Sequence, residues 1–113
     1  MGTFIYDNTA KVELEDRLLA HIQVVIGTKL PRSECFFFTW REDVSTGGGR
    51  RSVWLNPHTP MQFKFHGSRS PHLSRAWLDA LAFTANQPGG LYIVREPEEL
   101  TAAVASQSDE MMA

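Results

Sequence analysis

The residues whose types best suit a binding function are aromatic and basic side chains between positions 35 and 65. Apolar and polar residues alternate there, as in strands, where successive side chains point to opposite faces. This alternation places Phe37 and Trp54 on one face. It places the cations Arg41 and Lys64 on the same face. Aromatic rings beside cations are typical of surfaces that stack single-stranded nucleic acid, and an acidic protein segment would suit them too. The sequence therefore predicts a binding face for an anionic partner.

The same face has a second interpretation. Large aromatic side chains are usually buried somewhere, so the opening hairpin, the C-terminal tail or a second subunit would cover Phe37 and Trp54. A homodimer that buries this face is the structural alternative to a binding module.

A run of three glycines, residues 47–49, lies between Thr46 and the pair Arg50 and Arg51. A phosphate-binding P-loop has the pattern G-x-x-x-x-G-K-[ST] between a strand and a helix. Here the glycines join two predicted strands, which indicates a flexible hairpin loop. Arg50 and Arg51 then form a mobile basic tip that belongs with the candidate binding residues.

Histidines give the weaker catalytic candidates. His21, His58, His66 and His72 lack the spacing of a metal site, and no G-x-S-x-G motif or acid pair accompanies them. Arg17 and His21 are four residues apart on a predicted helix and are therefore neighbours. We predict no catalytic residue, no metal and no cofactor. An enzyme of unknown class built on Arg17, His21 or His66 is the remaining alternative.

The elements that position these residues follow from periodicity and turn chemistry. In chain order we expect a hairpin (3–6 and 11–14), a helix (15–30), three strands (35–41, 51–56 and 61–66), a second helix capped by Ser70 (71–86) and a last strand (91–94). The order ββ-α-βββ-α-β predicts an α+β fold, with a single antiparallel sheet and two helices. The apolar side of the three central strands is the expected core face: Phe36, Phe38, Trp40, Val53, Leu55, Phe63 and Phe65.

The length and the charge of the chain limit the class of protein to which it can belong. At 113 residues the chain has the size of one domain, which we place at residues 1–95, followed by an acidic tail at 96–113 that we expect to be partly disordered. The tail carries five acids and no base, whereas residues 1–95 hold all eleven Lys and Arg against eight acids. A basic domain favours an anionic partner, and the tail would screen the domain from it.

The single cysteine, Cys35, excludes an internal disulfide. The N-terminus lacks the features of a secretory signal, and no stretch approaches the ~20 apolar residues of a membrane span. We therefore expect a soluble, cytoplasmic protein with no membrane partner.

The chain resembles a family of short uncharacterised actinobacterial proteins, some of which carry the automatic label "ATP-dependent DNA ligase". The resemblance covers roughly residues 1–95 and rests on scattered matches: Met1-Gly2-Thr3, Tyr6, Glu15-Asp16-Arg17, Leu19-Ala20-His21, Val24-Val25-Ile26, Lys29-Leu30, residues 34–36, Trp40, Trp54-Leu55-Asn56-Pro57, Phe63, Phe65, Trp77 and residues 86–91. Asn56 and Pro31 stand where the family pattern has a histidine and a base. The family has no established activity, so no residue role is transferred.

The ligase label has no support in the residues. Nucleotidyl-transfer ligases use a lysine nucleophile in K-x-D-G, and the nearest string, Lys64-Phe65-His66-Gly67, lacks the aspartate. A chain this short would at most be a ligase-associated accessory protein.

Overall fold

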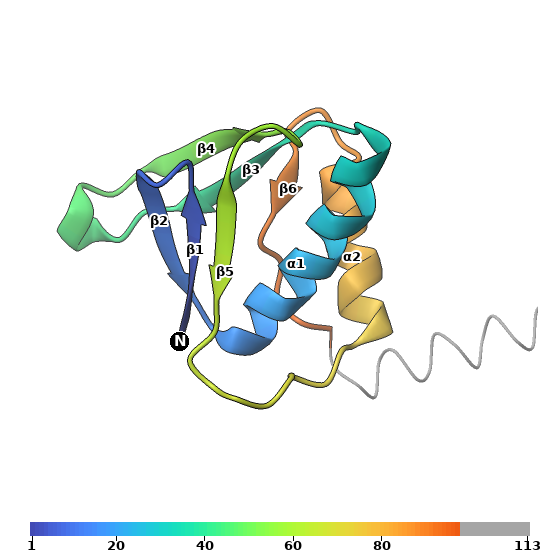
Figure 1. The fold of residues 1–113 in the computed structure, drawn as a ribbon. Coiled ribbons are helices and arrows are strands. Elements are labelled where there is room, and N and C mark those ends of the chain that lie inside the picture. The colour runs from blue at the N-terminus through green and yellow to red at the C-terminus, as the bar shows by residue number, and fades with distance from the viewer. Residues whose placement is uncertain (98–113) are drawn as a thin grey trace, which may run out of the picture.

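A computed structural model describes residues 1–97 of the chain (Figure 1). The predicted acidic tail lies outside the described residues, apart from its first two positions. The helices and strands, in chain order, are β1 (Gly2–Tyr6), β2 (Ala10–Leu14), α1 (Asp16–Lys29), β3 (Phe36–Arg41), β4 (Arg50–Leu55), β5 (Met61–Lys64), α2 (Arg75–Ala85) and β6 (Leu91–Tyr92). Short 3-10 turns at Leu30–Arg32 and Val44–Thr46 follow α1 and β3. The α+β class and the element order are confirmed.

Helix α1 matches its prediction to within one residue at each end. Asp16 opens it, where a carboxylate suits the positive end of the helix dipole, and Lys29 closes it at the negative end. Pro31 lacks the N–H that an α-helix would need there, so the chain tightens into a 3-10 turn.

Helix α2 begins later than expected, and the prediction that Ser70 caps it is wrong. The cap is Ser74, whose hydroxyl accepts a hydrogen bond from the Trp77 N–H at 3.3 Å, and the helix starts at Arg75. Contacts with α1 hold the segment before the helix, because the Ser74 N–H donates to Nε2 of His21 at 2.8 Å. A tertiary hydrogen bond therefore overrides the local Ser-Pro signal.

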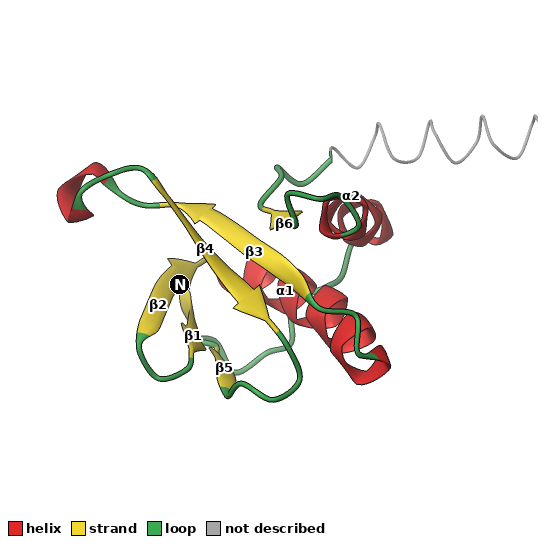
Figure 2. Cartoon of the chain, turned by 90° about the horizontal axis from the view of Figure 1, so that it is seen from above, coloured by secondary structure: helices red, strands yellow, loops and turns green. Residues whose placement is uncertain are grey.

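The prediction of a single antiparallel sheet is wrong. The six strands of residues 1–97 form two three-stranded sheets, ordered β2-β1-β5 and β4-β3-β6. Strand β6 runs parallel to β3, whereas the other pairs are antiparallel. The expected meander of three central strands breaks between β4 and β5, which lie in different sheets (Figures 1 and 2).

The turn between β4 and β5 explains the break. Asn56 organises it, because its Oδ1 accepts from the His58 N–H at 2.9 Å and its Nδ2 donates to the Thr59 hydroxyl at 2.9 Å. Pro57 and Pro60 have no N–H to donate to a hairpin ladder beside this turn. The chain instead crosses to β1, where the Pro60 carbonyl accepts from the Asp7 N–H at 2.8 Å.

One core lies between the two sheets and the two helices. Phe4 of β1 is fully buried and its ring centroid lies 5.4 Å from that of Phe38 on β3 and 5.2 Å from that of Phe63 on β5. The predicted core face is thus shared by both sheets. Leu19 and Leu81 bring α1 and α2 into the same cluster. The inward side of the β4-β3-β6 sheet is therefore covered. Within residues 1–97 no helix is both long and apolar enough to cross a membrane.

Candidate functional site

The second side of the β4-β3-β6 sheet carries most of the predicted binding residues. Strands β3 and β4 pair in a register that sets Phe37 opposite Trp54 and Arg41 opposite Arg50, and β6 pairs Tyr92 with Thr39. Paired residues share a side of the sheet, and alternate residues along each strand share it too. We name this side the outer face and define it by seven residues: Phe37, Thr39, Arg41, Arg50, Ser52, Trp54 and Tyr92.

Two aromatic rings form one end of the outer face. Phe37 and Trp54 are 42% and 49% exposed, and their ring centroids are 4.9 Å apart in an edge-to-face arrangement. The Tyr6 hydroxyl donates to the Trp54 carbonyl, which ties this end of β4 to the other sheet. A hollow of about 520 Å³, partly lined by Gln87, adjoins the two rings. A planar ligand would find an aromatic wall here with an amide beside it.

The middle of the outer face is polar and rigid. The hydroxyls of Thr39 and Ser52 are 2.6 Å apart, and Thr39 is buried. Tyr92 lies next to these hydroxyls because β6 begins in close contact with β3. A Cβ atom on Gly90 would lie 2.3 Å from the Phe37 carbonyl oxygen, and its φ of +86° is a conformation that glycine adopts freely.

The other end of the outer face is basic. Arg41 and Arg50 lie directly opposite each other on the two strands, both exposed. Neither forms an ion pair with a described residue. Two guanidinium groups on neighbouring strands therefore face solvent beside the hairpin tip, which projects from the rest of the fold in Figure 2.

Two predicted members do not join this face. Lys64 lies on β5 in the other sheet, where it pairs with Thr3 of β1. Arg51 points to the opposite side of its strand from Arg50, and its guanidinium forms an ion pair with Glu42. The structure thus brings together four of the predicted binding residues, Phe37, Arg41, Trp54 and Arg50, and separates two. Alternation along a strand predicted the grouping within β3 and β4, and only a correct strand pairing could have removed Lys64.

Tyr92 is the contributor that the sequence did not reveal as a site residue. The signal was the alternation of buried Leu91 with exposed Tyr92 after the turn at Gly89 and Gly90. Without the parallel pairing to β3, nothing placed that residue beside Thr39 on the outer face.

The glycine run is a structured hairpin tip. Gly47, Gly48 and Gly49 all have positive φ, from +70° to +107°. The N–H groups of Gly47 and Gly48 bond the carbonyls of Val44 and Asp43 at 3.1 Å and 2.9 Å. Two of the three glycine N–H groups are thus used within the turn, so the loop does not offer the row of free amides that a phosphate cradle needs.

The secondary candidates, Arg17 and His21, have structural contacts. His21 is fully buried, and its Nδ1 lies 2.7 Å from the Arg17 carbonyl while its Nε2 accepts from the Ser74 N–H. This geometry requires the neutral tautomer with the proton on Nδ1. The imidazole also lies against the Trp77 ring, with centroids 4.5 Å apart. His21 therefore joins α1 to the start of α2.

Arg17 fastens the C-terminal end of the described chain. Its guanidinium makes two hydrogen bonds to the Glu96 carboxylate, at 2.6 Å and 3.0 Å, and another to the His72 carbonyl. The hydrogen bonds from Arg17 hold the pKa of Glu96 below its usual range. The Trp77 Nε1–H donates to the Val94 carbonyl at 2.9 Å and supports the same attachment.

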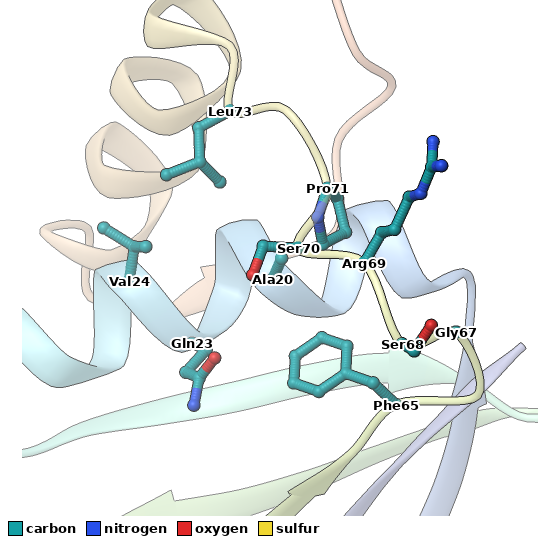
Figure 3. Close-up of a pocket in the computed structure, with 10 residues that line it drawn as sticks. All are labelled: Ala20, Gln23, Val24, Phe65, Gly67, Ser68, Arg69, Ser70, Pro71 and Leu73. Atoms are coloured by element: carbon teal, nitrogen blue, oxygen red, sulfur yellow. The ribbon is translucent and has the colours of Figure 1, made fainter.

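A separate hollow of about 320 Å³ lies between α1 and the loop after β5 (Figure 3). Phe65, Pro71 and Leu73 give it apolar walls, and the Arg69 side chain points away from it. The His66 and Gly67 N–H groups of this loop are bound to the Asp16 carboxylate. Paired acids, bases or nucleophiles do not converge on this lining, so it offers less chemistry than the outer face.

Comparisons with known proteins give a family without an assigned activity. A family model described as "Domain of unknown function (DUF7882)" matches residues 1–96. No curated protein and no solved structure matches the chain. Among the described residues, no group of three or more His, Cys, Asp or Glu side chains is placed to hold a metal ion.

Proposed function

We propose that this chain, which belongs to the DUF7882 family of domains of unknown function, is a non-catalytic module that binds single-stranded nucleic acid on its outer face. One observation carries the proposal: the exposed rings of Phe37 and Trp54 share the outer face with Arg41 and Arg50, which have no ion-pair partner among the described residues. Bases stack on aromatic rings whatever their sequence, and guanidinium groups bind the phosphates between them.

The dimensions of the outer face suit a short strand. Phe37 and Arg41 are four residues apart on β3, which is about 13 Å along a strand. Stacked nucleotides rise 3.4 Å each along one strand, so this length accommodates roughly four of them. The hydroxyl of Ser52 lies between the aromatic and basic ends, where it can donate to a sugar or phosphate oxygen.

The charge of the described domain favours the same ligand. Residues 1–95 carry an excess of Lys and Arg over acids, and Arg41 and Arg50 are at the exposed end of the outer face. Two phosphate contacts predict a salt dependence with a slope of about −1.4 in log K against log salt, since each contact to a single strand contributes about −0.7. Binding should therefore be modest and strongest at low salt.

A fluorescence anisotropy titration with an internally labelled oligothymidine tests the proposal. We expect Trp54→Ala to weaken binding about tenfold, because stacking is worth roughly 1–3 kcal/mol per base. Arg41→Gln should reduce the salt slope by about 0.7. The matched controls are Phe83→Ala, an exposed ring on α2, and Lys64→Gln, an exposed cation on the other sheet.

Two results would contradict the proposal. Absence of binding at low salt removes it, because phosphate contacts strengthen as salt falls. Equal losses in Trp54→Ala and Phe83→Ala would show that the outer face is not the binding surface.

A homodimer that buries the outer face is the second candidate, because Phe37, Trp54 and Tyr92 expose an apolar patch there. Light scattering separates the two proposals. A dimer that Trp54→Ala converts to a monomer supports burial between subunits, and a strict monomer excludes it. An acidic peptide that displaces the oligonucleotide would instead assign the outer face to a protein partner.

A further inference from the structure

A hollow of about 430 Å³ opens at the basic end of the outer face. Residues 12–14 of β2 form one wall, residues 39–41 of β3 another, and Arg50 and residues 92–93 complete the lining. Thr39, Arg41, Arg50 and Tyr92 are also members of the outer face, so the hollow adjoins it, whereas Trp40 reaches the lining from the core side of β3. A nucleic-acid strand that lies across the outer face would bring one end of the nucleic acid to this hollow.

Three residues that line the hollow carry hydrogen-bond donors with no partner among the described residues. Arg41 and Arg50 make no ion pair with a described residue. The Nε1–H of Trp40, a residue that is 3% exposed, is buried without a hydrogen-bond partner among the described residues. A buried donor without a partner is unusual in native proteins and points to a missing acceptor. Strand β4 pairs with Trp40 and Arg41 on one edge of β3, but on the other edge β6 pairs only with Phe38 and Thr39, so within the described part that second edge has no strand beside Trp40 and Arg41.

We infer that this hollow seats the terminal phosphate of a nucleic-acid strand bound on the outer face, an inference that rests on the function proposed above. A terminal phosphate carries about −1.5 to −2 charges at pH 7 and three strong acceptor oxygens. An internal phosphate carries a single charge. The terminal group therefore gains most from Arg41 and Arg50. We assign another of its oxygens to the Nε1–H of Trp40, a core residue that also lines the hollow.

The remaining lining suits the nucleotide that carries this phosphate. Val12, Leu14 and Ile93 supply apolar surface for a sugar or base, and the volume lies within the usual range of small-ligand sites. Glu13 is the one acid that the described residues place on this lining, and it opposes the phosphate charge. Removing the Glu13 charge should therefore strengthen the preference for a phosphorylated end. A variant of Glu13 thus tests the inference by an increase in this preference.

Competition by oligonucleotides that differ in their ends tests the inference on the full chain. An internally labelled oligothymidine of about eight nucleotides is displaced by unlabelled strands that carry a 5′-phosphate, a 3′-phosphate or hydroxyls at both ends. We expect one phosphorylated strand to compete about tenfold better than the hydroxyl strand. Arg41→Gln and Trp40→Phe should each reduce this preference severalfold, Glu13→Gln should increase it, and Lys64→Gln should leave it unchanged.

The outcomes separate this inference from the function on which it rests. If all three strands bind and compete equally, the terminal-phosphate site is wrong and the binding module stands. If none binds at low salt, both are wrong. A preference that survives in Arg41→Gln and in Trp40→Phe would place the phosphate elsewhere and overturn the inference. Trp40→Phe alters a core side chain, so the thermal unfolding of this variant is measured in parallel. If Trp40→Phe does not fold, Arg41→Gln alone decides the test.

Discussion

At the residue scale, Asp16 joins α1 to the loop after β5 with one carboxylate. Its two oxygens accept from the His66 N–H at 3.1 Å and the Gly67 N–H at 2.7 Å, and these bonds lower the pKa of Asp16 below its usual value. A carboxyl whose pKa is lowered in the folded state stabilises the fold above its unfolded pKa. This stability is lost as pH falls through the folded pKa.

We therefore expect the free energy of unfolding of the native protein to fall between about pH 5 and pH 2, and Asp16→Asn to flatten this dependence. Urea unfolding at several pH values measures it. Asp79→Asn is the control, because Asp79 is an exposed acid on α2 whose ion pair with Arg75 spans 3.6 Å. A pH profile that Asp16→Asn leaves unchanged would show that these loop bonds do not form in solution.

His21 is the second residue whose contacts predict a measurable effect. His21→Phe removes the acceptor of the Ser74 N–H and leaves a buried donor unpaired, so we expect a loss of about 2 kcal/mol in unfolding free energy. His21→Gln keeps an acceptor near the position of Nε2 and should recover part of the loss. His58→Gln, at an exposed turn position, is the matched control for urea unfolding. Equal stability of His21→Phe and the native protein would contradict the structural role of this imidazole.

At the element scale, local patterns predicted the strands and helices but not how the strands pair. Alternation correctly separated Phe37 and Trp54 from Phe38 and Leu55, because the side of a strand is a local property. Whether β5 pairs with β4 or with β1 depends on contacts between distant segments. The prolines near Asn56 predicted a turn, but they did not predict the direction in which the chain leaves it. For the same reason, the sequence-based prediction wrongly placed Lys64 on the outer face.

The parallel β6 strand depends on one glycine. Gly90→Ala should destabilise the fold by at least about 1–3 kcal/mol, because a φ of +86° strains a side chain and the added Cβ would meet the Phe37 carbonyl at 2.3 Å. It should also weaken oligonucleotide binding, since β6 would move away from β3 and carry Tyr92 off the outer face. Gly27→Ala is the control: a Cβ there meets no atom within 4 Å, so this exposed position of α1 should gain about 0.5–1 kcal/mol. Equal thermal shifts in the two variants would show that β6 does not need this close approach.

At the scale of the whole molecule, the function depends on which side of the β4-β3-β6 sheet is covered. The sequence left this open, because both sides of β3 carry aromatic residues. The core takes Phe36, Phe38 and Trp40 and leaves Phe37 exposed, since α1, α2 and the second sheet all pack on one side. The candidate face is therefore a consequence of how the two sheets share one core.

The charge of the whole chain should affect how tightly it binds a polyanion. The sequence has a net charge of −2, and residues 98–113 contribute four acids and no base: Glu98, Glu99, Asp109 and Glu110. Replacing these acids with Gln or Asn leaves the outer face intact and makes the chain positive. We expect tighter oligonucleotide binding by a fewfold at low salt, because the attraction to polyanions grows with positive charge, and little change near 1 M salt, where the Debye length is about 3 Å. Anisotropy titrations at both salt concentrations measure the effect. An unchanged affinity at low salt would show that the acids do not screen the outer face. A change that persists at high salt would show that they act through something other than their charge.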